Sequence, residues 1–535
     1  GAASVLGTLY WTPGSKLYKT TAFTPGGTWS STVEPAISGI LSSRKKLDTY
    51  LLRQADGTLW LFFTYMNAGD MDATAVYNLY YSKSSDDGAT WSAAVSLTSF
   101  TVPSEIARRP AAVQKLATQI VLAYDSVKTS LIMDKSSPYW TDESSQAIRG
   151  LHFNPSTRKL YAVYGNNGVG NKGIYGIVRI DVDTWTIDRF WNANTVPAIP
   201  AFFRENHVFY CHGDGAILAM IAQDAQILVL DDSANTLRIL SLEDNSTYGL
   251  TQNVTNVPWS SQYHTEYLGG IQVDSASNML YFAFLKTGNS GVAKILTFDY
   301  TQANPSCTVA TTFTTYVFDS TIPDVLDATA DSMVLDKENG YLIYCTKGLI
   351  STNRWAGSIR VFLLSGGGLY RHYYYQDSLP NFPYCGAGHP VIVGGKLYAG
   401  QWSYTTNYGQ GNYWGVLSVD LTSGAVKWYL PSGIIAGGPQ DAQFRCLTAT
   451  PSGTIVASCK AGVALLDTQT ETWSLINNTT TPGVFPTGIS DFGGAAIAHD
   501  AGNELIFLGV RDATSNSFTG VVAFPAAGKI EQTQY

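Results

Sequence analysis

The sequence predicts an all-β protein made of repeated four-stranded antiparallel sheets. Three observations predict it: a composition that favours strands, a hairpin unit that recurs along the chain, and one specific turn motif between two strands. The 535 residues are 45% hydrophobic and 13% aromatic but only 14% charged, against roughly 25% charged residues in an average soluble domain. A chain of this length and composition can bury a large core, so we expect it to be folded throughout.

Charge and hydropathy exclude two classes of partner. The net charge is −8, the isoelectric point lies near 5.4, and no basic run occurs. We therefore expect no nucleic acid and no anionic membrane as a main partner. No apolar stretch approaches the ~18 residues that a membrane span needs, so we expect no membrane insertion.

The first clear sheet lies at residues 37–97. The turn Asp56-Gly57-Thr58 precedes an apolar run at 59–63, which is typical of a strand buried on both faces. Residues 78–83 alternate as a strand does, and another strand follows through 95–97. The order strand, turn, strand, turn, strand predicts one blade of antiparallel strands.

The turn between the last two of these strands carries the most specific motif. Residues 84–91 read SSDDGATW and fit S-x-D-x-G-x-T-W at Ser84, Asp86, Gly88, Thr90 and Trp91. The Ser and Asp side chains cap turn amides, the glycine allows a conformation closed to other residues, and the indole buries an apolar face. The motif resembles the Asp box, or BNR repeat, of sialidase-like β-propellers. The resemblance implies a propeller fold.

Hairpins recur after this sheet. One unit is an apolar segment, a polar turn and a second apolar segment, at 152–164, 271–284, 333–344, 448–458 and 497–510. The other is a strand that ends in Asp, then a Thr or Ser turn and often a Trp, at 178–185, 416–428 and 463–473. Two hairpins make one four-stranded propeller blade.

End to end, these units give about ten blade-like segments, at 3–34, 37–97, 103–147, 148–196, 205–250, 262–315, 325–378, 386–432, 440–480 and 490–530. The segments 3–34 and 103–147 have the weakest pattern. We predict a β-propeller region over 1–535 with about 7–10 blade-like repeats, the Asp-box blade at 37–97 and further blades at 148–530. One large ring and two smaller rings both remain open, because common propellers have 4–8 blades.

The resemblance also says what an active enzyme of the family needs. It implies an Arg-Ile-Pro motif, three arginines for a substrate carboxylate, a Tyr–Glu nucleophilic pair and an Asp acid/base. Arg-Ile-Pro is absent before Asp56, and the nearest match is Arg108-Arg109-Pro110. Arg108 is thus the one weak catalytic candidate. The alternative is an arginine pair at a sheet edge before a strand that begins with proline.

No metal or cofactor site is predicted. The seven histidines are scattered, and the closest pair, His207 and His212, lacks a ligand at metal-site spacing. The glycine-rich segments at 165–171 and 409–412 lie between expected strands, so they lack the helix N-terminus that a phosphate loop requires.

Aromatic segments between strands are candidate binding residues. They combine rings with amides and hydroxyls, which suits stacking on sugars or anchoring a protein partner. A similar aromatic segment lies at 370–375. For each segment the alternative is that its rings pack between blades. The candidates are Trp402, Tyr404, Tyr408, Tyr413 and Trp414.

The cysteines contain no C-x-x-C pair. If Ser452-Gly453 is a two-residue turn, Cys446 and Cys459 stand opposite each other, and they are a disulfide candidate in an oxidising compartment. Two buried thiols are the alternative.

Four sequons are candidate glycosylation sites in a secretory eukaryote. They lie at Asn245, Asn253, Asn477 and Asn478.

Three functions fit these observations. The first is a non-catalytic propeller, extracellular, on the cell surface or in a virion, that serves as a structural or binding module. Its partners would be other subunits of an assembly, such as a virion, tail or surface filament, or surface glycans. The second is an exo-acting sialidase-like glycoside hydrolase, and the third is a secreted receptor-like ligand-binding propeller. The sequence favours the first, because it retains the scaffold motif without the enzyme motifs.

Overall fold

The structure is a computed structural model of the chain. It describes residues 2–5, 8–11, 18–20, 37–39, 46–66, 77–99, 106–116, 119–134, 146–166, 176–192, 211–222, 226–242, 254–257, 268–285, 292–314, 333–351, 354–374, 386–402, 415–431, 434–435, 444, 446–459, 461–477, 496–511, 518–525 and 531–534. Within these ranges the regular elements are all strands. The chain divides into two compact units. Unit 1 is Gly1–Thr129, Thr481–Thr487 and Ala523–Tyr535, and unit 2 is Ser130–Thr480 and Gly488–Val522.

Within the described residues, unit 2 contains six four-stranded antiparallel sheets and the end of a ten-stranded sheet, and we call these seven groups of four strands blades 1 to 7. Blade 1 contains β10 Gln146–Asn154, β11 Lys159–Asn166, β12 Gly176–Asp181 and β13 Thr186–Asn192. Blade 2 contains β14 Cys211–Asp214, β15 Ile217–Ala222, β16 Gln226–Asp231 and β17 Thr236–Ser241. Blade 3 contains β18 Leu268–Asp274, β19 Met279–Leu285, β20 Val292–Asp299 and β21 Thr308–Thr314.

Blades 4 to 6 repeat this order. Blade 4 contains β22 Met333–Asp336, β23 Tyr341–Ser351, β24 Arg354–Leu363 and β25 Leu369–Tyr374. Blade 5 contains β26 Gly386–Val393, β27 Lys396–Trp402, β28 Val416–Asp420 and β29 Val426–Tyr429. Blade 6 contains β30 Cys446–Ala449, β31 Thr454–Cys459, β32 Gly462–Asp467 and β33 Thr472–Ile476.

Blade 7 joins distant parts of the chain. Its first three strands come from the C-terminal region, and its fourth is β9, which precedes blade 1 in sequence and belongs to unit 2 from Ser130 onward. Such a blade closes a ring, because it holds the two ends of the repeat array in one sheet. Its strands are β34 Ile497–Asp500, β35 Leu505–Arg511, β36 Phe518–Pro525 and β9 Gln119–Asp134.

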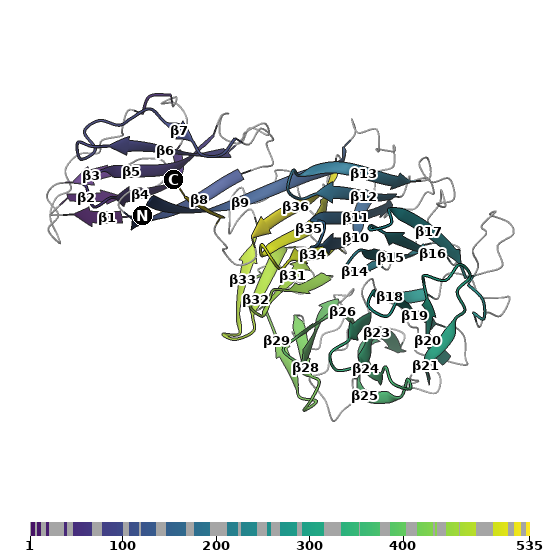
Figure 1. Ribbon diagram of the computed structural model, residues 1–535. Coiled ribbons are helices and arrows are strands. Elements are labelled where there is room, and N and C mark those ends of the chain that lie inside the picture. The colour runs from purple at the N-terminus through teal and green to yellow at the C-terminus, as the bar shows by residue number, and fades with distance from the viewer. Residues whose placement is uncertain are drawn as a thin grey trace. The chain divides into compact units, whose positions relative to one another are not determined.

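The first strands of the seven blades confirm that the ring is closed. Each contacts the first strand of the next blade, from β10 through β14, β18, β22, β26 and β30 to β34, and β34 contacts β10 again. Figure 1 shows these blades around a common centre, coloured from blue through teal and green to yellow. The all-β propeller fold that the sequence predicts is therefore confirmed, and unit 2 forms one ring of seven blades in its described residues.

Unit 1 contains the segment with the S-x-D-x-G-x-T-W motif. Its described strands form a three-stranded sheet, β1-β2-β3, and a second sheet in which β4, β5, β6, β8 and β9 follow one another, with β7 paired to β6 and β37 to β9. Its strands, besides β9, are β1 Ala2–Val5, β2 Thr8–Trp11, β3 Tyr18–Thr20, β4 Lys46–Arg53, β5 Leu59–Met66, β6 Tyr77–Ser84, β7 Val95–Ser96, β8 Ile106–Leu116 and β37 Glu531–Gln534.

The order of strands expected at 37–97 is present as β4, β5, β6 and β7, but this segment lies in unit 1 and is not one of the seven blades of unit 2. The segments 3–34 and 103–147 likewise contribute β1–β3, β8 and β9 instead of complete blades. The physical reason is that a hairpin pattern predicts which neighbouring strands pair, whereas it does not say which larger sheet the hairpin joins.

Apolar side chains between neighbouring blades form the core of unit 2. The third strands are buried on both faces; in β16, for example, every residue from Gln226 to Leu230 is buried. One cluster joins Tyr161 and Trp191 of blade 1 to Met220 and Leu230 of blade 2. Burial on both faces explains why these strands are continuous apolar runs.

The two ends of the blades differ in their connections. Because the strands are antiparallel, the turns after the first and third strands of a blade lie at one end, which we call the turn end. These turns are short, such as 155–158 and 182–185 in blade 1. The other connections leave from the opposite end, which we call the loop end. Several are long, such as 193–210, 315–332 and 403–415.

Candidate functional site

Aspartates at the ends of strands build the turn end. The Asp181 Oδ1 atom accepts hydrogen bonds from the backbone amides of Asp183 and Thr184, both at 2.9 Å. Such a bond satisfies turn amides that have no partner in the sheet. The same bond recurs in other blades. The corresponding residues are Asp231, Asp299, Asp420 and Asp467.

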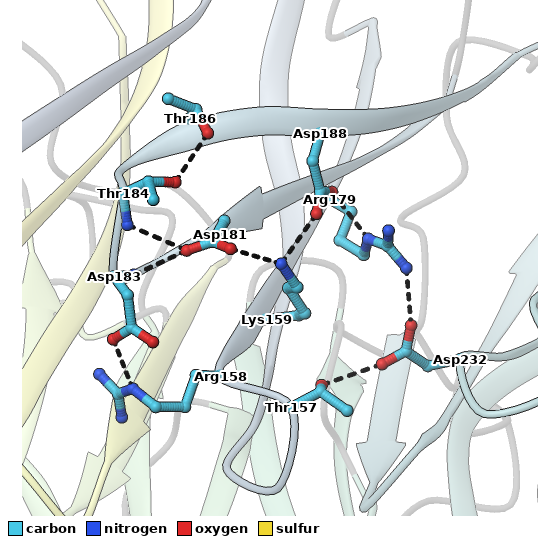
Figure 2. Close-up of polar contacts among 10 residues, drawn as sticks. All are labelled: Thr157, Arg158, Lys159, Arg179, Asp181, Asp183, Thr184, Thr186, Asp188 and Asp232. Atoms are coloured by element: carbon cyan, nitrogen blue, oxygen red, sulfur yellow. Dashed lines mark hydrogen bonds and ion pairs between the residues drawn. The ribbon is translucent and has the colours of Figure 1, made fainter.

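A charged network lies at the turn end of blade 1, and Figure 2 shows its members. Lys159 Nζ is 2.5 Å from Asp181 Oδ2 and 2.9 Å from Asp188 Oδ2. Arg179 Nε is 2.7 Å from Asp188 Oδ1, and Arg179 Nη1 is 3.0 Å from Asp232 Oδ1. Asp232 belongs to blade 2, so the network joins two blades.

Asp232 is the most buried carboxylate of this network, with 3% of its side chain exposed. Thr157 donates a 3.0 Å hydrogen bond to its Oδ2 atom, and Asn154 donates another at 3.2 Å. Burial raises the pKa of Asp232, but the hydrogen bonds and the Arg179 charge outweigh it, so the pKa is lowered. Burial likewise opposes the charge of Arg179, and its two carboxylate partners raise its pKa nonetheless.

These carboxylates stay ionised at neutral pH. The Lys159 ammonium and two turn amides lower the pKa of Asp181, and the pKa of Asp188 is lowered too because Arg179 and Lys159 outweigh its burial. A general acid for glycoside cleavage needs a raised pKa. The network therefore suits the joining of blades and does not suit proton donation.

Similar bonds join other blades at the turn end. Arg238 of blade 2 donates to the carbonyls of Tyr300 and Gln302 in blade 3, and Arg371 of blade 4 donates to Thr422 O of blade 5 at 2.6 Å. Further pairs between blades include Thr311 with Gly367 O, Lys427 with Glu471, and Arg158 with Asp500. The last pair links blade 1 to blade 7, where the ring closes.

The S-x-D-x-G-x-T-W motif at 84–91 in unit 1 forms the expected turn. Ser84 Oγ donates to Asp86 Oδ1 at 2.7 Å and accepts from the Gly88 amide at 2.8 Å. The Thr90 amide donates to Asp86 Oδ1 at 2.8 Å. Gly88 has a φ of +79°, which only glycine adopts readily. The Trp91 ring packs against buried Leu59, Leu61 and Phe63 of β5 together with Ile37.

The pKa of Asp86 is lowered to about 2 by hydrogen bonds from Thr90 and then from Ser84. The unfolded carboxyl titrates near its ordinary value of about 3.9. Its contribution to stability is therefore complete above that value and is lost as the pH falls towards 2. We expect Asp86→Asn to lower the melting temperature near neutral pH, and we expect its difference from the wild type to shrink between about pH 4 and about pH 2. Thermal melts over this range measure it, and a constant difference would contradict the assignment.

The catalytic and binding candidates from the sequence are only partly placed. Arg108 lies in β8 of unit 1, where its backbone is paired with Asp125. Trp402 ends β27 at the loop end of blade 5. Tyr404, Tyr408, Tyr413 and Trp414 lie outside the described residues. The aromatic segment at 370–375 proves to be mostly strand, because Leu369–Tyr374 is β25.

The Cys446–Cys459 geometry expected from the sequence is wrong by one residue. Cys446 is paired with Ser458, because Pro451, Ser452 and Gly453 form a three-residue connection in place of a two-residue turn. A shift of one residue moves a side chain to the other face of the sheet. Both cysteines are buried thiols outside any disulfide.

Of the four sequons, Asn477 is described. Its side-chain amide donates a 2.9 Å hydrogen bond to Ala461 O, so the atom that would carry a glycan is bonded to the backbone. Asn245, Asn253 and Asn478 lie outside the described residues.

Across the described ranges, no three His, Cys, Asp or Glu side chains are grouped so that they could hold a metal ion. In the same part of the chain, no helix has the length and apolar character to cross a membrane.

No protein-family model and no curated protein matches the sequence. Solved structures that resemble the chain include one from a crystal structure of the mitotic checkpoint complex. It is 10% identical, with a TM-score of 0.42, and the match covers 75% of this chain and 95% of that one. Another is the extracellular domain of the hybrid two component system BT3049 from B. thetaiotaomicron. It is 12% identical, with a TM-score of 0.45, and the match covers 98% of this chain and 61% of that one. The fold assignment rests on the sheet topology, independently of these likenesses.

Sequence reasoning missed the charged network of blade 1. Asp181 belongs to the repeat of strands that end in aspartate, and Asp231 is the equivalent residue of blade 2. Asp232 comes one residue later and accepts a hydrogen bond from Arg179 of blade 1. An available signal was the concentration of charge at 158–159, 179–188 and 231–232 in a chain with only 14% charged residues.

Proposed function

We propose that this chain is a non-catalytic β-propeller module, outside the cytoplasm or in a virion, that binds a partner subunit or a surface glycan through the loop end of unit 2. The observation that carries the proposal is the difference between the two ends. The turn end consists of short capped turns, and its carboxylates are held by Lys, Arg and backbone amides. The long connections, which include the aromatic segment 403–414, leave from the loop end. Binding residues are commonly found on long connections that a rigid scaffold positions.

The resemblance of the unit 1 motif to the Asp box supports the same proposal. Ser84, Asp86 and Thr90 form hydrogen bonds with one another and with the turn amides, so their role is to stabilise the turn. In this interpretation the motif indicates the fold, and other residues carry the binding chemistry.

A loop-end variant tests the proposal. We expect the combined substitution Trp402→Ala, Tyr404→Ala and Tyr408→Ala to weaken binding about tenfold or more, because each stacking ring contributes roughly 0.5–1.5 kcal/mol. The probes are an array of immobilised glycans and the assembly from which the native protein is purified. The matched control is Tyr370→Ala at the turn end, a 41% exposed ring, which should leave binding unchanged.

Other outcomes would favour another function. Equal loss of binding in the Tyr370 variant would move the binding surface away from the loop end. Turnover of a fluorogenic sialoside that falls in Arg108→Ala would replace the proposal with the glycoside hydrolase. A monomer that binds neither glycans nor a subunit, but captures a soluble ligand, would favour the receptor-like alternative.

A further inference from the structure

The first strands of three consecutive blades carry a polar side chain at the same place. His152, His212 and Gln272 each lie two residues before the residue that ends the strand, which is Asn154, Asp214 or Asp274. Each of the three side chains bonds the backbone of the next blade. Blades 1 to 4 are therefore joined in series by two histidines and one glutamine.

The outer two of these bonds have a clear direction. His152 Nε2 is 2.9 Å from Gly215 O of blade 2, so this nitrogen donates, because a carbonyl can only accept. Gln272 Nε2 donates to Met333 O of blade 4 at 2.6 Å. The His152 ring also lies against the backbone of blade 2: a Cβ atom at Gly213 would be 2.0 Å from its Cγ.

The bond of His212 depends on protonation. The backbone amide of Val273 in blade 3 lies 3.0 Å from His212 Nδ1. An amide nitrogen can only donate, so Nδ1 must keep its lone pair and the ring must be neutral. A proton on Nδ1 would place two donors against each other and break the bond.

The His152 bond does not depend on protonation in this way, because Nε2 donates whether the ring is neutral or charged. Burial lowers the pKa of His152, against the opposing effects of Gly215 O, Asp214 and Asp232. Asp214 and Asp274 end the strands that carry His212 and Val273. Lys337 lies 2.5 Å from Asp214 and 2.6 Å from Asp274, and Ser275 donates to Asp214, so these carboxylates already have partners.

We propose that the junction of blades 2 and 3 is an acid-sensitive switch: protonation of His212 on Nδ1 in mildly acidic solution breaks its bond to the Val273 amide and loosens the junction, while the Gln272 junction between blades 3 and 4 stays closed. Gln272 joins its two blades through a side chain that does not titrate. The chain therefore contains its own pH-insensitive comparison.

Hydrogen exchange of the full chain tests this proposal. Protection of peptides from β14 and β18 is measured at about pH 7.5 and about pH 5.5, on either side of the ordinary histidine pKa, with each rate divided by its intrinsic value. We expect protection around Val273 to fall about tenfold or more in the acid sample. Protection of Met333–Asp336 should change much less.

The variant His212→Gln provides the second arm. Because the glutamine Oε1 atom can accept from the Val273 amide and does not titrate, this variant should be as protected as the wild type at the higher pH and should keep that protection in acid. Equal protection of Val273 at both pH values in the wild type would overturn the proposal. The same acid loss in the folded variant would also overturn it, and if that variant does not fold, the wild-type comparison still decides.

Discussion

Asp232→Ala is expected to lower the free energy of unfolding of the propeller by about 3–5 kcal/mol, because it leaves a partly buried guanidinium without its inter-blade carboxylate. Asp232 accepts bonds from Arg179, Thr157 and Asn154. Its side chain is 3% exposed and that of Arg179 is 19% exposed. Urea denaturation, followed by a probe in unit 2, measures the loss.

Asp183→Ala is the matched control, because it removes an aspartate at the turn end of blade 1 that also pairs with an arginine. The Asp183 carboxylate lies 2.6 Å from Arg158, but its side chain is 59% exposed. Exposed pairs contribute about 0–1 kcal/mol, so this variant should resemble the wild type. An equal decrease in the free energy of unfolding in the two variants would show that the buried contact between the blades stabilises the propeller no more than the exposed pair does.

Trp91→Ala is expected to destabilise unit 1 by about 3 kcal/mol, at the lower end of the range for buried aromatic rings because the residue is only partly buried. Its ring covers the apolar cluster of Leu59, Leu61 and Phe63. Its Nε1 atom is buried without a hydrogen-bond partner, so the expected loss comes from packing.

The variant Trp91→Phe separates packing from hydrogen bonding. It keeps an apolar ring on the cluster and should cost less than about 1.5 kcal/mol. Thermal melts of both variants measure the difference. A silent Trp91→Ala variant would mean that the motif does not hold its sheet together.

The sequence predicted the local structure well, because hairpins and turns depend on neighbouring residues. The alternation at 78–83 and the turn residues around Asp86 predict β6 and the Asp box without reference to distant parts of the chain. The strand-ending Asp181, Asp420 and Asp467 likewise predict turns that the structure contains.

Long-range relations could not be predicted in this way. No local pattern shows that β9 joins β36 across almost the whole sequence, or that β4 to β7 belong to a different unit from the four-stranded sheets of blades 1 to 6. Arg179 and Asp232 meet because neighbouring blades bring their turn ends together. The cysteine register failed for a smaller reason, since one extra residue in the turn at 451–453 changes which residues face each other.

The most direct test of this account is an experimental density map of the native protein in which the blades are counted and traced. The account predicts one ring of seven four-stranded blades, with β9 as the outer strand of the blade formed by β34, β35 and β36. A ring with a different number of blades, or one in which residues 37–97 form a blade, would contradict it.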